Sequence, residues 1–364
     1  MPRDGRIGAL DRLRGVVMLL MAVDHASGVF NAGRLMTDGP TLYEAGTALP
    51  AAQFLTRWIT HLCAPTFVFL AGTALALSVE RRRARGESER ALDRFIVTRG
   101  LFIAALDPLW MSWVFVPGRI LLQVLYAIGG GLCAMAALRR LPDRWLAGTG
   151  VAIVLGGELL TGLALLATDG TPSLPAGLLL TGGAFGPVIV GYPLVPWLAM
   201  MMIGWSFGRF VLAADRTRIA RVLAVAGAAA LVAFVVVRGI DGYGNMRLLR
   251  EDASLVQWLH VSKYPPSLAY TSLELGLMAL LLAALVRRER ELSPLDVLGQ
   301  TALAFYLLHA HVLTLAGVVS GLEHRAGLAT TYVAAAAVAV LLYPVCARYR
   351  RYKAAHPDGW ARYV

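Results

Sequence analysis

The sequence predicts an all-α fold, a polytopic transmembrane helix bundle of about ten spans, and three observations support this prediction. Hydrophobic residues make up 57% of the 364 positions and charged residues only 16%, a balance typical of neither a soluble domain nor a disordered chain. Apolar segments long enough to cross a bilayer recur along the whole chain. Lys and Arg gather at the ends of those segments. We therefore expect one integral membrane domain over residues 1–364, with the lipid bilayer as its surroundings.

The expected spans follow one another with short basic turns or longer, less basic connections between them. They are residues 15–30, 53–79, 97–116, 119–138, 145–168, 188–212, 219–238, 266–286, 295–319 and 329–347.

The net charge of +11 suggests nucleic acid in a soluble protein, but here the charge follows the membrane topology. Most of the 34 Lys and Arg fall in the two tails and in every second loop, so both termini are predicted to be cytoplasmic and no nucleic-acid partner is expected. The longer connections on the opposite side, 31–52, 169–187 and 239–265, are expected to shape a site or a lid.

The first two spans carry ionisable residues that are expensive at membrane depth and therefore candidates for function. Asp24 and His25 are adjacent in the first span, so they point about 100° apart and each needs a partner on another helix. Arg57 and His61 stand at i and i+4 in the second span and face the same way.

Further polar and aromatic residues fall in the outer halves of later spans, which predicts one polar cavity open to the non-cytoplasmic side. As possible substrate contacts we single out Asp107, Tyr192, Trp197, Lys263, Tyr264, Glu274, His309 and His311. Each of them could also be a hydrogen-bonding partner between helices or an aromatic residue of the membrane interface.

This set of side chains permits two kinds of chemistry. A neutral imidazole can remove a proton from an amine or hydroxyl that attacks an acyl carbon, while Asp orients it and Arg or Lys holds an anion or oxyanion. The same residue types can build a proton relay in a transporter. The three cysteines lack metal-ligand spacing, so no metal site is expected.

A family resemblance enters at Arg14 and His25, which are separated by ten residues and match the Arg-x10-His signature of the acyltransferase family 3 membrane enzymes. The order of motifs resembles even more the heparan-alpha-glucosaminide N-acetyltransferase family and its bacterial relatives. The motifs are residues 10–15 (LDRLRG), 64–72 (APTFVFLAG), 192–197 (YPLVPW), 263–267 (KYPPS) and 305–309 (FYLLH).

The resemblance implies a transmembrane acyltransferase in a bacterial-type cytoplasmic membrane. Such an enzyme moves an acyl group from cytoplasmic acetyl-CoA or another acyl-CoA to an amine or hydroxyl of a sugar-containing or lipid-linked acceptor on the far side, as in glycan modification of the cell envelope. The lysosomal enzyme has Asn where Asp24 stands, and its catalytic His follows the first span, where 31–52 holds no His. The role of His25 is therefore carried over from the Arg-x10-His signature.

The resulting hypothesis assigns His25 as base, Asp24 and His61 as orienting partners, Arg57 and Lys263 as acceptor or oxyanion contacts, and Arg14 as a contact to CoA phosphates. One alternative is a proton-coupled transporter of an amphipathic or sugar-linked solute. Another is an enzyme that acts on a lipid or isoprenoid by acid catalysis. A homodimer is possible, because residues 129–131 are three glycines that permit close helix packing within one chain or between two.

Overall fold

The computed structural model describes residues 8–288, 293–356 and 359, and helices make up most of them. The long helices are α1 (Gly8–Phe30), α3 (Cys63–Ala84), α4 (Glu89–Leu106), α6 (Val124–Leu138), α7 (Asp143–Leu166), α9 (Leu194–Ala213), α10 (Arg216–Ile240), α12 (Leu268–Arg287), α14 (Ala302–Ser320) and α15 (Leu328–Ala355). The short helical elements are α2 (Ala51–Trp58), η1 (Ile59–Leu62), η2 (Asp107–Met111), α5 (Ser112–Phe115), α8 (Leu174–Ala176), η3 (Gly177–Thr181), α11 (Leu255–Leu259) and α13 (Pro294–Gln300).

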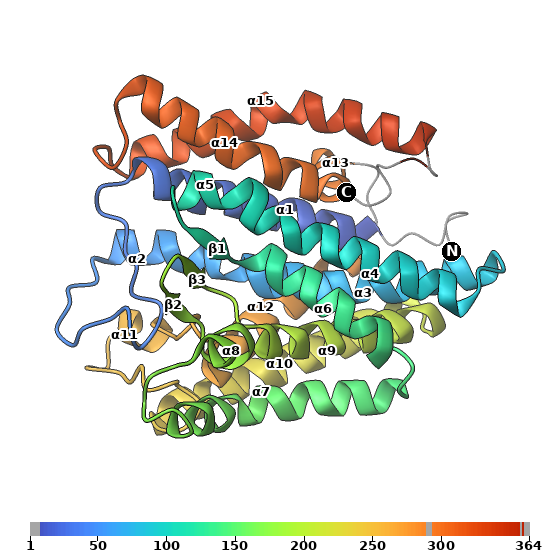
Figure 1. Cartoon of the computed structure of the whole chain (residues 1–364), viewed down its shortest axis with the longest axis horizontal. Coiled ribbons are helices and arrows are strands. Elements are labelled where there is room, and N and C mark those ends of the chain that lie inside the picture. Colours follow the sequence, from blue (N-terminus) through green and yellow to red (C-terminus); the bar gives the residue numbers. More distant parts are fainter. Residues whose placement is uncertain (1–7, 289–292, 357–358, 360–364) are drawn as a thin grey trace.

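The predicted all-α membrane bundle is confirmed. Within the described residues, nine helical stretches are long and apolar enough to cross a membrane. Two of them are composite: α2, η1 and α3 run together over Ala51–Ala84, and α4, η2 and α5 over Glu89–Phe115. The helices run roughly parallel to one long direction (Figure 1).

The expected span at residues 119–138 differs from the others, because only its second part is helical. Residues Ile120–Leu122 form the strand β1, and α6 covers the remaining 15 residues. The carboxylate of Asp107 accepts hydrogen bonds from the backbone N–H groups of Gln123 and Tyr126, both at 2.7 Å, and so caps the start of α6. Apolar composition alone does not reveal that the helix begins only at Val124, which is why the predicted span was too long.

A three-stranded sheet lies at one end of the bundle. It has the order β1-β3-β2, with β3 (Val188–Val190) parallel to β1 and antiparallel to β2 (Gly183–Phe185). In Figure 1 this sheet, α2 and α11 lie at the left end, while α1 begins and α15 ends toward the right. The start of α1, the end of α15 and the α3–α4 turn thus lie at the same end of the bundle. That this end is cytoplasmic stays a prediction.

Glycines bring several helices into direct backbone contact. A Cβ at Gly72 of α3 would lie 2.1 Å from the carbonyl oxygen of Met201 on α9, and one at Gly204 of α9 would lie 2.0 Å from that of Phe69. The three glycines at 129–131 also pack within this chain, since their nearest atoms belong to α4 and α9. Larger side chains at these positions would force the helices apart.

Candidate active site

A small buried cavity of about 40 Å³ lies among α1, η1, α3, α14 and the start of α6. One part of its lining is polar and another part is apolar. The polar lining consists of Asp24, His25, Thr60, Gln123, Tyr192, Lys263 and Tyr306. The apolar lining consists of Met21, Cys63, Ala64, Phe67 and Val124. Because a cavity needs roughly 10–15 Å³ of such free space to hold one water molecule, this cavity has room for a few waters or a reacting group and not for a whole substrate.

His25 and His309 meet beside this cavity, although they lie far apart in sequence. Their Nδ1 and Nε2 atoms are 2.7 Å apart, and Nδ1 of His309 is 2.9 Å from the carbonyl oxygen of Phe305. A carbonyl only accepts, so Nδ1 of His309 carries the proton and, in the neutral ring, Nε2 accepts. Nδ1 of His25 must then donate to it. This arrangement leaves Nε2 of a neutral His25 without a proton, as a base requires.

Arg57 joins the carboxylates of Asp24 and Asp38 from two different segments. Its Nη1 lies 2.5 Å from Oδ1 of Asp24, its Nε lies 2.7 Å from Oδ2 of Asp38, and its Nη2 also pairs with Asp38. Arg34 adds a second guanidinium to Asp24 at 3.0 Å. His61 stands behind Asp38, with Nε2 at 3.4 Å from Oδ1, and does not line the cavity. The two aspartates are therefore held as ionised partners of arginines.

Asp38 shows how strongly this pairing acts. Burial by itself would raise the pKa of its carboxyl, but the charges of Arg57 and His61 outweigh burial and hold that pKa well below its usual value. The segment 31–50 that carries Asp38 is thereby fixed over the outer part of the bundle. Neither Asp38 nor Arg34 was among the sequence-predicted site residues. The available signal was that Arg34 is the only basic residue of that connection.

Lys263 reaches the cavity from the segment between α11 and α12. Its side chain is 3% exposed, and its ammonium lies 5.1 Å from the ring centroid of Tyr264 and 5.9 Å from that of Tyr192. Among the described residues, its Nζ has no hydrogen bond or ion pair. The backbone N–H groups of Lys263 and Tyr264 donate to the carbonyl of Asp38 at 2.8 and 3.1 Å. The backbone thus ties the Lys263 and Asp38 segments together.

Five other predicted site residues lie outside the cavity lining. Trp197 is fully buried and packs on Tyr192 with ring centroids 4.6 Å apart. Glu274 is buried on α12 at 1% exposure. Asp107 caps α6, as described above. His311 packs between Trp110 and Trp113 at 4.8 and 4.7 Å. Tyr264 also stays outside the lining, but it touches Lys263.

Arg14 lies toward the opposite end of α1 from His25. The two are eleven positions apart on the helix, a rise of about 16 Å. Its Nη1 pairs with Asp11 at 2.9 Å, and its Nη2 donates to the carbonyl of Leu70 on α3 at 3.3 Å. Arg14 therefore belongs to the same end of the bundle as the Arg-rich α3–α4 turn and has no part in the cavity around His25.

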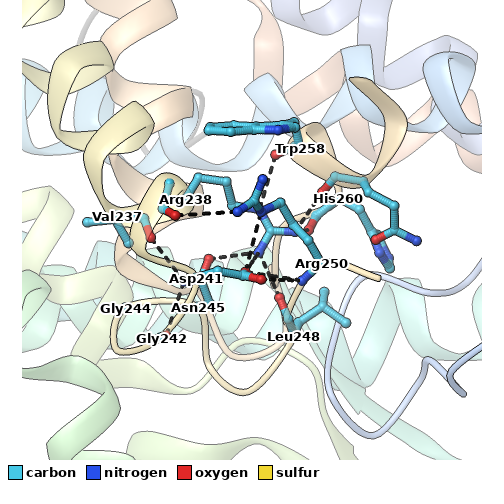
Figure 2. A network of polar contacts seen from close by, with 12 residues as sticks. Val237, Arg238, Asp241, Gly242, Gly244, Asn245, Leu248, Arg250, Trp258 and His260 are labelled. Carbon is cyan, nitrogen blue, oxygen red and sulfur yellow. Dashed lines mark hydrogen bonds and ion pairs between the residues drawn. The ribbon is translucent and has the colours of Figure 1, made fainter. Parts of the chain in front are cut away.

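A second buried arginine, Arg238, holds the 241–265 segment that leads to Lys263. Arg238 is 0% exposed and donates to the carbonyls of Leu248, Gln257, Trp258 and His260 at 2.6–3.1 Å. Figure 2 shows Leu248, Trp258 and His260 around its guanidinium. The side-chain oxygen of Asn245 is a further acceptor at 2.8 Å. Nothing in the sequence indicates this role, because Arg238 stands at the end of an apolar helix like any interfacial charge.

His260 connects this segment to the 31–50 segment. Its Nε2 lies 2.9 Å from the carbonyl oxygen of Thr37, so Nε2 carries the proton and donates. Its ring packs edge-on against Tyr43 at 4.6 Å. Burial lowers the pKa of His260 below its usual value, although the Thr37 carbonyl acts in the opposite direction. The contacts from Arg238 to Asp38 thus form a continuous scaffold around the cavity.

Comparison with known families gives two matches. Residues 6–238 match the family described as heparan-alpha-glucosaminide N-acetyltransferase, catalytic. Residues 205–360 match a protein family of unknown function, DUF418. No curated protein matches the chain. The first match contains His25, Asp24 and Arg57, and the second contains Lys263 and His309, so the cavity is built from both regions.

The first match covers well over half of the chain and agrees with the all-helical membrane fold. The chain therefore belongs to the heparan-alpha-glucosaminide N-acetyltransferase catalytic family of membrane-bound acetyltransferases.

Proposed function

We propose that the protein transfers an acetyl group from acetyl-CoA, bound at the Arg-rich end, to an amine or hydroxyl of a sugar-containing or lipid-linked acceptor that enters from the sheet end. The observation that supports this proposal best is the chain of hydrogen bonds from Phe305 through His309 to His25. In this chain Nε2 of His25, which is not bonded to His309, can accept a proton at the cavity.

In the proposed reaction the acceptor's N–H or O–H gives its proton to Nε2 of His25 as the nitrogen or oxygen attacks the thioester carbon. The protonated ring still donates from Nδ1 to His309, so the contact survives the proton transfer. The tetrahedral intermediate then breaks its carbon–sulfur bond, and the CoA thiolate takes the proton from His25. The new amide or ester is released, and His25 is neutral again.

Lys263 is the cation best suited to stabilise the oxyanion of that intermediate. It lines the same cavity as His25, and none of the described carboxylates is within ion-pair distance of its Nζ. A charge held in a cavity surrounded by protein acts on a developing oxyanion more strongly than it would in bulk water. Arg57 is occupied by two aspartates, so we assign it, with Asp24 and His61, the role of holding the site together.

The donor end has its own group of cations. This group consists of Arg14, Arg82 and Arg99 of α4. Among the described residues, the buried Nε of Arg99 has no hydrogen-bond partner. The charges of Arg14 and Arg82 both act on Arg99. Guanidinium groups from α1, α3 and α4 suit the phosphates of CoA. A larger cavity of about 510 Å³ is lined by Arg83, Arg139 and Arg209, each of which is paired with a carboxylate. Arg14 and Arg82 also have carboxylate partners. We favour the Arg14 group because it includes Arg99, whose buried Nε has no hydrogen-bond partner among the described residues.

The pairing of Asp24 bears on the two alternative functions. A carboxylate that accepts from two guanidinium groups is poorly suited to donate a proton, which argues against acid catalysis on a lipid or isoprenoid. A proton-coupled transporter finds no support in the family to which the chain belongs. A homodimer and the bacterial-type cytoplasmic membrane stay predictions.

Purified protein with radiolabelled acetyl-CoA tests the proposal. With glucosamine as the probe acceptor, we expect labelled N-acetylglucosamine and free CoA in equal amounts. Saturable binding of acetyl-CoA with slow CoA release and no product would mean that the acceptor is another compound, and the assay is then repeated with a membrane lipid extract. Absence of both binding and CoA release would overturn the proposal.

Sidedness is tested in whole cells. A single cysteine placed at the exposed Asp252 should react with a membrane-impermeant maleimide, and one at the exposed Arg85 should react only after the cells are opened. The chain without an added cysteine is the control, since Cys63 and Cys346 are buried. The reverse pattern would place the acceptor on the cytoplasmic side.

A further inference from the structure

The proposed proton transfer uses the polar lining of the cavity and assigns no role to its apolar lining. Ala64 and Phe67 stand at i and i+3 on α3 and so share one face of that helix. Met21 of α1 and Val124 of α6 complete the wall. The only polar group among them, the thiol of Cys63, donates to the carbonyl of Val17 at 3.3 Å. This part of the cavity therefore suits a small apolar group.

The wall is rigid, because each of its helices is held in backbone contact with another. The carbonyls of Met201 and Phe69 occupy the space beside Gly72 and Gly204, which fixes α3 to α9. On α1, a Cβ at Gly15 would lie 2.2 Å from the carbonyl of Leu295 on α13. Helices packed this closely cannot move nearer to their outer partners to widen the cavity between them.

The free volume is correspondingly small. A cavity of about 40 Å³ has room for only a few water molecules, since each needs roughly 10–15 Å³ of such free space. The methyl and carbonyl of an acetyl group approach this size, whereas each methylene of a longer acyl chain needs further space. Protein interiors resist overfilling, because they are close-packed.

We propose that Met21, Ala64, Phe67 and Val124 form the acyl-binding pocket of the enzyme and that Phe67 limits the acyl group to acetyl. This inference rests on the proposed acetyl transfer and names the part of that site that selects the donor. Phe67 is the specificity-determining residue because it is the largest side chain of the wall and is only partly buried. Shortening it enlarges the cavity without removing a core residue.

The test compares acetyl-, propionyl- and butyryl-CoA as donors with purified protein, by CoA release and by calorimetric binding. The wild type should prefer acetyl-CoA to propionyl-CoA by roughly 10-fold to 200-fold in kcat/KM, the range for one methylene in a tight pocket. Phe67→Ala should reduce this preference at least 10-fold by accepting the longer donors. Ala64→Leu should weaken binding of all three acyl-CoAs and leave binding of CoA itself unchanged.

Phe69→Ala is the matched control, because Phe69 is on the same helix but packs on Phe207 of α9 at 5.4 Å. It should lower the melting temperature and leave the donor preference unchanged. Equal use of butyryl- and acetyl-CoA by the wild type, or the same preference in Phe67→Ala as in the wild type, would overturn the pocket while leaving acetyl transfer intact. Failure of every acyl-CoA to bind would overturn the proposed function as well.

Discussion

Arg57 and Arg238 are both buried arginines, yet their surroundings differ in kind. Arg57, at 6% exposure, pairs with two carboxylates that come from α1 and from the 31–50 segment. Arg238, at 0% exposure, donates mostly to backbone carbonyls of the single segment that follows its own helix. It also has an ion pair at 3.5 Å with Asp241, which does not line the cavity. Carbonyls cannot change their protonation state, whereas carboxylates beside a cavity can act on charges that appear there.

The comparison teaches that burial of a charged residue in a membrane bundle does not by itself mark a functional site. Both arginines satisfy the requirement that a buried charge be paired or hydrogen-bonded. The two arginines differ in what their partners contact. Asp24, one partner of Arg57, lines the cavity with His25 and Lys263. Arg238 instead holds the segment that carries Lys263. We therefore expect the two regions to fail in different ways when altered.

The largest effect is expected at His25. His25→Ala removes the proposed base, so turnover of acetyl-CoA should fall by roughly 10²-fold to 10⁴-fold. The melting temperature should change little, because the ring faces a wet cavity. Single-turnover transfer and thermal unfolding on one preparation check this. A mutant with wild-type transfer and a lower melting temperature would show that His25 is a packing residue like those around Arg238.

The next effect is expected at Arg238. Arg238→Ala leaves several buried carbonyls without a donor, and each hydrogen bond to a charged group contributes about 1.5–3 kcal/mol. We expect the free energy of unfolding to fall by more than about 3 kcal/mol, with a large loss of folded protein. Arg57→Lys, which keeps its charge, should instead lower turnover per folded molecule and affect stability less. If both variants lose activity only in proportion to folded protein, the two regions do not differ.

A moderate, pH-dependent effect is expected at Asp38. Its pKa is lower in the folded protein than in the unfolded chain, so its contribution to stability is present above the unfolded value of about 4 and is lost as pH falls below it. Melting temperatures measured from pH 7 to pH 3 should fall at the acidic end. Asp38→Asn should be less stable at pH 7 and lose part of this dependence. The same change of melting temperature with pH in the mutant would show that the ion pair with Arg57 does not cause it.

The smallest effect is expected at His311, which serves as the matched control for His25. It lies between Trp110 and Trp113 and does not line the cavity. His311→Ala should lower turnover less than about 10-fold and cost about 1–3 kcal/mol at most through lost packing. A loss as large as that of His25→Ala would extend the active site to the far side of α14.

Much of the fold followed from the sequence, because long apolar segments and basic turns report directly on membrane crossing. The site was predicted in part. His25, Asp24 and Lys263 converge at one cavity, whereas the sequence could not reveal that Asp38 completes the pairing, since a loop residue has no periodicity to place it. One failure was avoidable. His309 and His311 are two residues apart on a helix and point about 200° apart, so only one of them could face His25.

The short helix α6 has a consequence for the membrane itself. Its 15 residues span about 22 Å, against a hydrocarbon thickness of about 30 Å, and the sheet strand β1 takes the place of the missing turns. Strand backbone at that depth needs hydrogen-bonding partners that lipid does not supply. Here β3 supplies those partners, so this part of the chain requires protein rather than lipid beside it.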